Sequence, residues 1–144
     1  MSQENVELVV GLQPADLDLV QLFGDEKQWA EVAERIADLF QPDFECAFLG
    51  STPSKEVYAG LDGLRGLWLD WLAPWVTYRI EVEEAIDLGD RVLLLIRDYG
   101  RRESRAEEVA MNGTAIWTIR DGKMARAEFY PIRHEAFKAA GLEA

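Results

Sequence analysis

The side chains best suited to chemistry in this sequence are carboxylates that lie within predicted strands. Asp98 follows the apolar run Val92 to Ile96, and Glu128 lies in the run Lys123 to Tyr130. A carboxyl group in an apolar cavity loses hydration of its charged form, so its pKa rises toward the range that suits proton transfer near neutral pH. Asp98 and Glu128 are therefore the candidate catalytic residues. The alternatives are a solvated or structural Asp98 and a Glu128 that forms a surface ion pair.

Aromatic side chains are the candidate ligand contacts. Trp68, Trp71 and Trp75 are spaced i, i+3 and i+7, which predicts one stripe along a helix. This pattern favours core packing, and the alternative is the aromatic wall of a ligand cavity. In a hollow fold the same side chains can pack in the core and also form the wall of a cavity. Three tyrosines are predicted to donate hydrogen bonds to a bound molecule: Tyr58, Tyr99 and Tyr130.

Other kinds of site have little support in the sequence. His134 is the one histidine and Cys46 the one cysteine, so there is no Cys/His spacing for a metal ion. Neither Ser104 nor Cys46 has the sequence context of an activated nucleophile. A phosphate-binding glycine motif is also absent. We therefore expect no metal and no cofactor.

Composition narrows the classes of partner and location. The 144 residues have 27 acidic and 15 basic side chains, a formal charge of −12 that repels nucleic acid. Arg101, Arg102 and Arg105 lie close together, but acidic residues lie among them. The longest apolar run is far too short to cross a bilayer, and the polar start does not resemble a signal peptide. A single cysteine favours the reducing cytoplasm.

Helical spacing dominates the first half of the chain. Asp25 followed by Gln28 is a capping-box pattern, and Pro42 is expected to end the helix that begins there. A second long helix is predicted from about Gly60 to Pro74. The shorter elements of this half are predicted helices at Glu4 to Val10 and Ala15 to Phe23, and a strand at Phe44 to Leu49.

From Val76 onward the hydrophobic period changes from 3.6 to 2, which predicts antiparallel strands. Val92 to Ile96 is apolar on both faces, so something must cover its second face, and another subunit is the simplest candidate. We therefore expect a homodimer. The predicted strands run from Val76 to Ile86, Arg91 to Tyr99, Glu107 to Ile119 and Lys123 to Tyr130, before a helix at Glu135 to Ala140.

Strand alternation restricts the candidate acids. Arg97 and Asp98 cannot both enter one cavity from a regular strand. Asp121-Gly122 predicts a two-residue hairpin turn, which would place Glu128 on the same face as Trp117 and Tyr130. A bulge in either strand would shift this pairing by one residue and change which residues share a face. The face that points inward is not determined by the pattern.

Four stretches of the sequence resemble bacterial SnoaL-like proteins of the nuclear-transport-factor-2-like superfamily. They cover nearly the whole chain, although the region between Gly11 and Gln28 is longer than the usual opening helix pair. The stretches are Met1-Ser-Gln-Glu-Asn-Val-Glu, Tyr58-Ala-Gly-Leu-Asp-Gly-Leu-Arg, Trp117-Thr-Ile-Arg-Asp-Gly-Lys and Phe129-Tyr-Pro-Ile-Arg-His-Glu-Ala-Phe-Lys-Ala-Ala-Gly-Leu.

This resemblance implies one α+β domain over residues 1–144, a cone whose curved antiparallel sheet and N-terminal helices enclose a cavity. It also implies frequent dimerisation. Steroid isomerases of this fold use an acid with a tyrosine, and its epoxide hydrolases use an Asp-Arg-Asp network. Fold alone does not choose among such functions. No paired acids are evident on the last two strands, so we expect first a domain that binds a small apolar molecule, second an acid–base enzyme, and third a dimeric interaction module.

Overall fold

The fold is built on one curved six-stranded sheet, seen in a computed structural model that describes residues 2–15, 17–49, 57–103 and 105–142. The strand order is β2-β1-β6-β5-β4-β3, and every neighbouring pair is antiparallel except β1 and β6, which are parallel. The predicted meander of four antiparallel strands is confirmed as β3 to β6. The parallel β1–β6 pair and the short β2 were not predicted.

The helices and strands follow the hydrophobic period closely in the second half of the chain and less closely in the first. Their bounds are α1 Ser2–Leu12, α2 Leu19–Gly24, α3 Glu26–Ile36, a 3₁₀ turn Ala37–Leu39, β1 Phe40–Phe48, β2 Val57–Ala59, α4 Gly60–Leu72, β3 Trp75–Asp87, β4 Arg91–Arg102, β5 Val109–Arg120, β6 Lys123–Tyr130 and α5 Arg133–Ala139.

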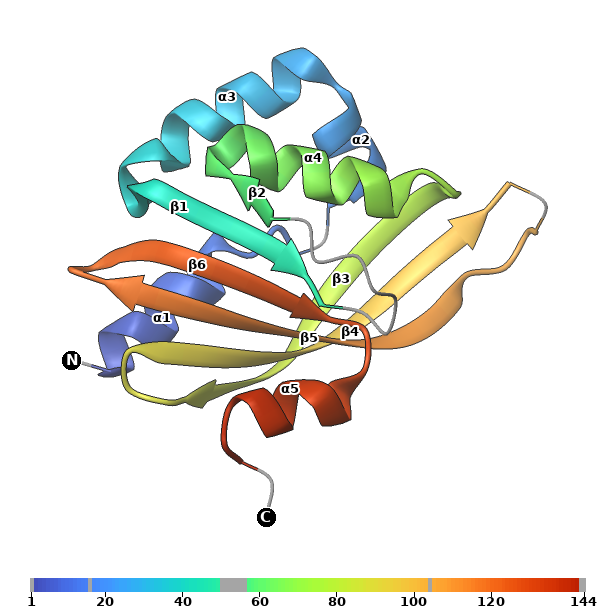
Figure 1. Ribbon diagram of the computed structural model, residues 1–144. Helices are drawn as coiled ribbons and strands as arrows, with labels where there is room; N and C mark the ends of the chain where they lie inside the picture. The colour runs from blue at the N-terminus through green and yellow to red at the C-terminus, as the bar shows by residue number, and fades with distance from the viewer. Residues whose placement is uncertain (1, 16, 50–56, 104, 143–144) are drawn as a thin grey trace.

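The helices divide between the two faces of the sheet (Figure 1). Helices α2, α3 and α4 lie together over one face, and α5 lies against the other. Helix α1 contacts β3 and β4, and its Val9 is fully buried in the main core. The curved sheet and the helices on its first face therefore surround one interior. None of the described helices is long and apolar enough to cross a membrane.

The start of α3 is as predicted, but its end is not. The Asp25 carboxylate accepts a hydrogen bond from the Gln28 amide at 3.0 Å, so it caps the first turn. The helix ends at Ile36, and a 3₁₀ turn leads into β1, which contains Pro42. The prediction that Pro42 ends the helix is therefore wrong. Proline is compatible with a strand where its missing N–H leaves no ladder bond unmade.

The last hairpin has the predicted turn but a different register. Asp121 and Gly122 both have positive φ, and Arg120 pairs with Lys123, as a two-residue turn requires. A bulge between Thr118 and Ile119 then shifts the pairing by one residue, so Glu128 opposes Ile116 and not Ala115. The predicted grouping of Glu128 with Trp117 is therefore wrong, because the bulge moves Trp117 to the opposite face.

The outer face of the central strands is covered by the chain itself. Leu93 and Ile116 are fully buried, and they form a second apolar cluster with Ala136 and Ala140 at the C-terminal helix. Another subunit was the simplest candidate to cover the second face of Val92 to Ile96, but on that face Leu93 is buried by the C-terminal helix of the same chain. The homodimer itself stays a prediction.

Candidate functional site

A cavity of about 530 Å³ lies between α4 and the curved sheet. This volume is within the usual range for small-molecule pockets. Its walls come from the ends of α4, β1 and β6, from the middle of β3, β4 and β5, and from the segment after β6. The side chains that define its chemistry are Phe48, Trp68, Trp71, Tyr78, Ile80, Ile96, Asp98, Met111, Thr114, Phe129 and Arg133.

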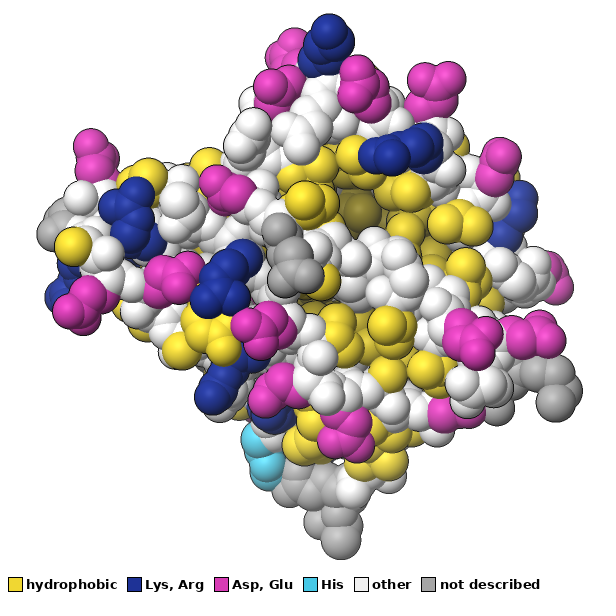
Figure 2. All heavy atoms as spheres, turned by 180° about the vertical axis from the view of Figure 1, so that it is seen from behind, with side chains coloured by type: hydrophobic (Ala, Val, Ile, Leu, Met, Phe, Trp, Pro, Cys, Tyr) yellow, Lys and Arg dark blue, Asp and Glu magenta, His cyan; other side chains and the backbone are white. Residues whose placement is uncertain are grey.

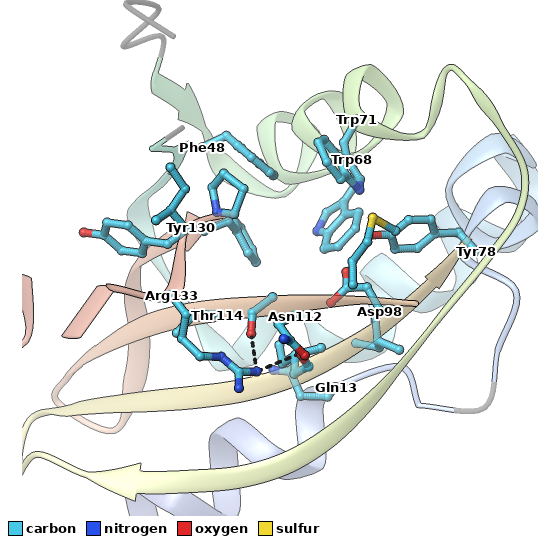
Figure 3. Close-up of a pocket in the computed structure, with 17 residues that line it drawn as sticks. Gln13, Phe48, Trp68, Trp71, Tyr78, Asp98, Asn112, Thr114, Tyr130 and Arg133 are labelled. Carbon is cyan, nitrogen blue, oxygen red and sulfur yellow. Dashed lines mark hydrogen bonds between the residues drawn. The ribbon is translucent and has the colours of Figure 1, made fainter. Parts of the chain in front are cut away.

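Aromatic rings form one side of the cavity. In Figure 3, Trp68, Trp71 and Tyr78 gather together above Asp98. Trp68 meets Tyr78 and Phe129 edge to face, with ring centroids 6.2 and 5.6 Å apart. These rings pack against one another and also border empty space, so the stripe predicted on α4 belongs to both the core and the cavity wall.

Trp75 does not extend that stripe. It begins β3 and pairs with Arg102 across to β4. Its ring lies against Gly100, where an added Cβ would stand 2.5 Å from the ring. The predicted placement of Trp75 on the same helix face is wrong because α4 ends at Leu72, ahead of Pro74.

Asp98 is the buried acid of the cavity. Its residue is 8% exposed, and its Oδ2 accepts a hydrogen bond of 2.5 Å from the Tyr78 hydroxyl. Burial raises the pKa of Asp98 to about 6, whereas the Tyr78 hydrogen bond and the charge of Arg133 act in the opposite direction. Burial also raises the pKa of Tyr78, so this hydroxyl keeps its proton. A carboxyl group in this state can exchange a proton near neutral pH.

Alternation along β4 decides which neighbour of Asp98 enters the cavity. Asp98 points inward, while Arg97 lies on the other face, where its guanidinium is 3.5 Å from the Asn112 side-chain oxygen. The close approach of Asp98 to β5 depends on Gly113. A Cβ at that position would stand 2.4 Å from Asp98 Oδ1, so only glycine leaves room for the carboxylate.

Four buried polar side-chain atoms lack a hydrogen-bond partner in the part of the chain that the structure describes. They are Asp98 Oδ1, Thr114 Oγ1, Trp117 Nε1 and Arg133 Nε. Asp98 and Arg133 line the cavity, and Thr114 borders it, but Thr114 opposes Leu95 and Tyr130, so its side chain lies on the outer face of the sheet. Trp117 lines a smaller, adjoining space of about 80 Å³ between the helices and the sheet, which shares Trp68 and Phe129 with the cavity. Buried polar groups are normally paired, so these atoms mark where a bound molecule or water would be held.

Arg133 closes the cavity beyond the end of β6. Its Nη2 donates to the Ile96 and Gly113 carbonyl oxygens, both at 3.2 Å, and forms an ion pair of 3.1 Å with Glu83. Sequence reasoning missed Arg133 and Tyr78. Tyr78 was detectable, because it belongs to the apolar residues that alternate with charged ones along this strand. Arg133 was not, because it lies ahead of the helix predicted at Glu135 to Ala140, although the structure begins α5 at Arg133.

The predicted ligand-contact residues are divided by the structure. Trp68, Trp71 and Tyr130 line the cavity together with Asp98. Figure 3 shows the Tyr130 ring pointing away from the tryptophans. Its hydroxyl lies 3.4 Å from Glu128, and burial raises its pKa to about 12.

Tyr58, Tyr99 and Glu128 are not among the residues that line the cavity. Tyr58 lies on β2 against Gly63 and Gly66 of α4, and its hydroxyl donates to Asp70 at 2.6 Å.

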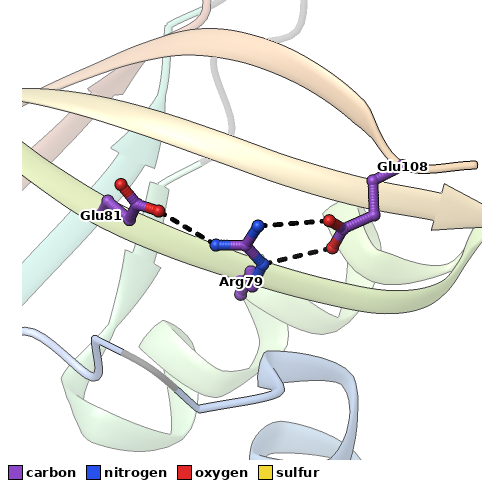
Figure 4. A network of polar contacts seen from close by, with 3 residues as sticks. All are labelled: Arg79, Glu81 and Glu108. Atoms are coloured by element: carbon purple, nitrogen blue, oxygen red, sulfur yellow. Dashed lines mark hydrogen bonds and ion pairs between the residues drawn. The ribbon is translucent and has the colours of Figure 1, made fainter.

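The other two lie on the outer face of the sheet. The Tyr99 ring lies 4.0 Å below the Arg79 guanidinium. That guanidinium binds Glu81 and Glu108 (Figure 4). Glu128 lies 3.7 Å from Arg126, as its ion-pair alternative predicts. Whether any of these residues contacts a ligand stays a prediction.

The described residues also bear on two other kinds of site, metal centres and reactive thiols. On the face seen in Figure 2, hydrophobic side chains gather around a hollow and charged side chains are scattered about it. Among the described residues, no group of three or more His, Cys, Asp or Glu could bind a metal ion. Cys46 is fully buried, and burial raises the pKa of its thiol to about 12. It is therefore an unreactive core residue.

Comparison with known proteins agrees with this architecture. Residues 26–127 match the family of the SnoaL-like domain. No curated protein matches the chain. A putative SnoaL-like polyketide cyclase from Jannaschia sp. CCS1 superposes with a TM-score of 0.65 at 17% identity, covering 99% of this chain and 94% of its own.

Two further solved structures are similar at the level of the fold. One is an NTF2-like protein from Burkholderia xenovorans LB400, with a TM-score of 0.60, 20% identity and 90% of both chains covered. The other is TerC co-crystallised with polyporic acid, with a TM-score of 0.63, 18% identity, and 96% of this chain and 98% of TerC covered. At identities this low, the superpositions show a shared fold and nothing about a shared activity.

Proposed function

The chain belongs to the SnoaL-like domain family, and from this premise we propose that it binds a largely apolar, ring-containing small molecule in the cavity beside α4. Trp68 and Trp71 would contact the faces or edges of the rings, and Asp98 would form the main polar contact. The crystallisation of its structural neighbour TerC with polyporic acid is in keeping with a small-molecule role.

One observation carries this proposal. Asp98 Oδ1 is buried at an apolar cavity, has no partner among the described residues, and belongs to a carboxyl group whose other oxygen is fixed by Tyr78. An unpaired buried polar atom costs about 1–3 kcal/mol. A ligand that donates a hydrogen bond to this oxygen would recover that free energy, and the aromatic wall would add contact area.

The same carboxyl group supports a second candidate function, acid–base catalysis without a cofactor. Its pKa of about 6 places it between its two protonation states near neutral pH. The oxygen that faces the cavity would accept or deliver the proton, and Tyr78 would keep the carboxyl group oriented through the hydrogen bond of 2.5 Å. Isomerisation, ring closure or hydrolysis of an apolar ring compound would all use such a group. Glu128, on the outer face, has no evident part in this site.

Binding and catalysis are separated by one experiment. Tryptophan fluorescence is titrated with a panel of apolar ring compounds, and each compound that binds is then analysed for products. Trp71→Ala should weaken binding because it removes a cavity wall. Asp98→Asn should reduce turnover by roughly 10²–10⁴ if Asp98 is a general acid or base. If the protein binds the compound without converting it, neither the wild type nor Asp98→Asn forms a product.

Leu69→Ala is the matched control for Trp71→Ala. Leu69 is an exposed residue of the same helix and does not line the cavity. Equal losses of affinity in the two variants would show that the wall has no specific role. If no compound binds the wild-type protein, both the binding and the enzyme proposals are wrong, and a role as an interaction module becomes the better account.

Two further expectations are proposals with narrower support. The homodimer now rests on the family resemblance alone, and sedimentation at micromolar concentration tests it; a monomer would end it. A cytoplasmic location rests on the single free cysteine, and cell fractionation tests it.

A further inference from the structure

A second hollow opens beside the cavity, next to the connection between β4 and β5. It has a volume of about 550 Å³ and shares Trp71 and Met111 with the cavity, so the two spaces meet at these side chains. We call this hollow the vestibule. The residues that line it are Trp71, Trp75, Arg102, Arg105, Val109 and Met111. Two are arginines, and none carries a carboxylate.

Arg102 is positioned by an aromatic ring. Its guanidinium carbon lies 4.8 Å from the centroid of the Trp75 ring, and that ring lies against Gly100. A cation–π contact uses the face of the guanidinium and leaves the N–H groups at its edge available. Neither Arg102 nor Arg105 forms an ion pair with a carboxylate of the described residues.

Arg79 is a useful comparison for Arg102, because it has the carboxylate partners that Arg102 lacks among the described residues. It is also stacked on an aromatic ring, with its guanidinium 4.0 Å from the centroid of Tyr99, but Glu108 and Glu81 take up its N–H groups (Figure 4). The chain has 27 acidic side chains against 15 basic ones, so acids are plentiful. Arg102 and Arg105, which have no ion pair among the described residues, therefore keep N–H groups available to an anion beside the cavity.

We propose that the molecule bound in the cavity is an amphipathic anion, whose carboxylate or phosphate group lies in the vestibule near Arg102 and Arg105. This inference rests on the proposed function and specifies its ligand. The rings of the ligand would lie against Trp68 and Trp71. The part of the ligand that links the rings to the anionic group would pass Met111 to reach the arginines. The ligand is thus an aromatic or alicyclic acid, or a phosphate ester of a ring compound.

The vestibule contributes affinity that depends on salt. Arg102 and Arg105 are exposed, so water and ions screen their charges. Charges at the rim of a site mainly raise the association rate and the preference for one sign of ligand. Removing one arginine is expected to weaken anion binding roughly two- to five-fold, and removing both about ten-fold, at low ionic strength.

Two fluorescent probes with the same ring skeleton test this inference. 8-Anilinonaphthalene-1-sulfonate is an amphipathic anion, and N-phenyl-1-naphthylamine is its neutral counterpart. Dissociation constants of both are measured for the wild type, Arg102→Gln, Arg105→Gln and the double variant, at ionic strengths of about 0.01 M and about 0.3 M. Arg35→Gln is the matched control, because Arg35 is exposed on α3, lines neither space and has the same change of charge.

The expected result is a loss of affinity for the sulfonate in the two vestibule variants, greatest in the double variant and smaller at high salt. Binding of the neutral probe should stay unchanged in all variants, and Arg35→Gln should behave as the wild type. Equal affinity for the sulfonate in the wild type and the double variant would overturn the inference. So would an equal loss in Arg35→Gln, since it would show an effect of net charge alone.

The two proposals fail in different ways. If the neutral probe does not bind, or binds equally well to Trp71→Ala, the cavity proposal is wrong. If the neutral probe binds in the cavity but the vestibule variants do not distinguish the probes, only the anion inference is wrong. If instead the vestibule variants lose affinity for the sulfonate, competition by 2-naphthoate and by 2-naphthyl phosphate distinguishes the two kinds of anion, because the preferred one displaces the sulfonate at lower concentration.

Discussion

Asp98 and Tyr99 are neighbours on β4, but one faces the cavity and the other the outer face of the sheet, and polar groups are paired differently in these two regions. Asp98 faces the interior, where it is buried with one partner and one unpaired oxygen. Tyr99 faces outward, where its ring supports Arg79 between two glutamates. The outer network satisfies its charges in solvent and contributes little free energy. The inner site leaves buried atoms unpaired, which is a cost to stability that a ligand can remove.

The largest expected difference between the two regions is the pH dependence from Asp98. Its pKa is about 6 in the folded protein and close to 3.8 in the unfolded chain, so the folded protein binds more protons between these values. Stability therefore falls as pH rises through this window, by roughly 3 kcal/mol. Urea unfolding from pH 4 to pH 7 measures it. Asp98→Asn should lack this component, and identical pH profiles for the two proteins would contradict the burial argument.

Gly113→Ala should have the next largest effect. Its Cβ would stand 2.4 Å from Asp98 Oδ1, and relieving that contact must displace the carboxylate or the strand. We expect a loss of about 1–3 kcal/mol in the free energy of unfolding, as for overpacking elsewhere. In an Asp98→Ala background the loss should shrink, because the colliding atom is gone. A loss of the same size in both backgrounds would place the strain elsewhere.

Thr114→Val should be neutral or stabilising by up to about 1 kcal/mol, because the buried hydroxyl has no partner and valine has nearly the same shape. The measurement is thermal or urea unfolding without ligand. A clear destabilisation would mean that the hydroxyl already has a partner.

The smallest effect is expected on the outer face. A double-mutant cycle with Arg79→Gln and Glu108→Gln should give a coupling of about 0.2–1 kcal/mol, because both side chains are about 40% exposed. The coupling should decrease with added salt. A coupling above about 2 kcal/mol, unaffected by salt, would show that the outer network is a major source of stability and that the two regions differ less than proposed.

Prediction from sequence succeeded where periodicity and local chemistry act over a few residues. The Asp25 cap, the Asp121-Gly122 turn and the strand Lys123–Tyr130 all depend on neighbouring groups, and all are present. The candidates Asp98, Trp68 and Trp71 come to the cavity because their elements were placed correctly. The errors arose where one residue shifts a register, as at the bulge after Thr118, or where a helix ends earlier than its hydrophobic pattern, as at Ile36.

The sequence by itself determined the α+β class, the meander and the acidic composition of the chain, because composition and hydrophobic period are properties of the chain alone. The tertiary structure decided which polar groups meet. Tyr78 and Asp98 are 20 residues apart, and Asp98 approaches Gly113 only because β4 lies between β3 and β5. Alternation assigns a residue to a face, but curvature and bulges decide whether that face encloses a cavity. The Asp98 oxygen that has no partner among the described residues, and the vestibule beside the cavity, are therefore products of packing between distant segments.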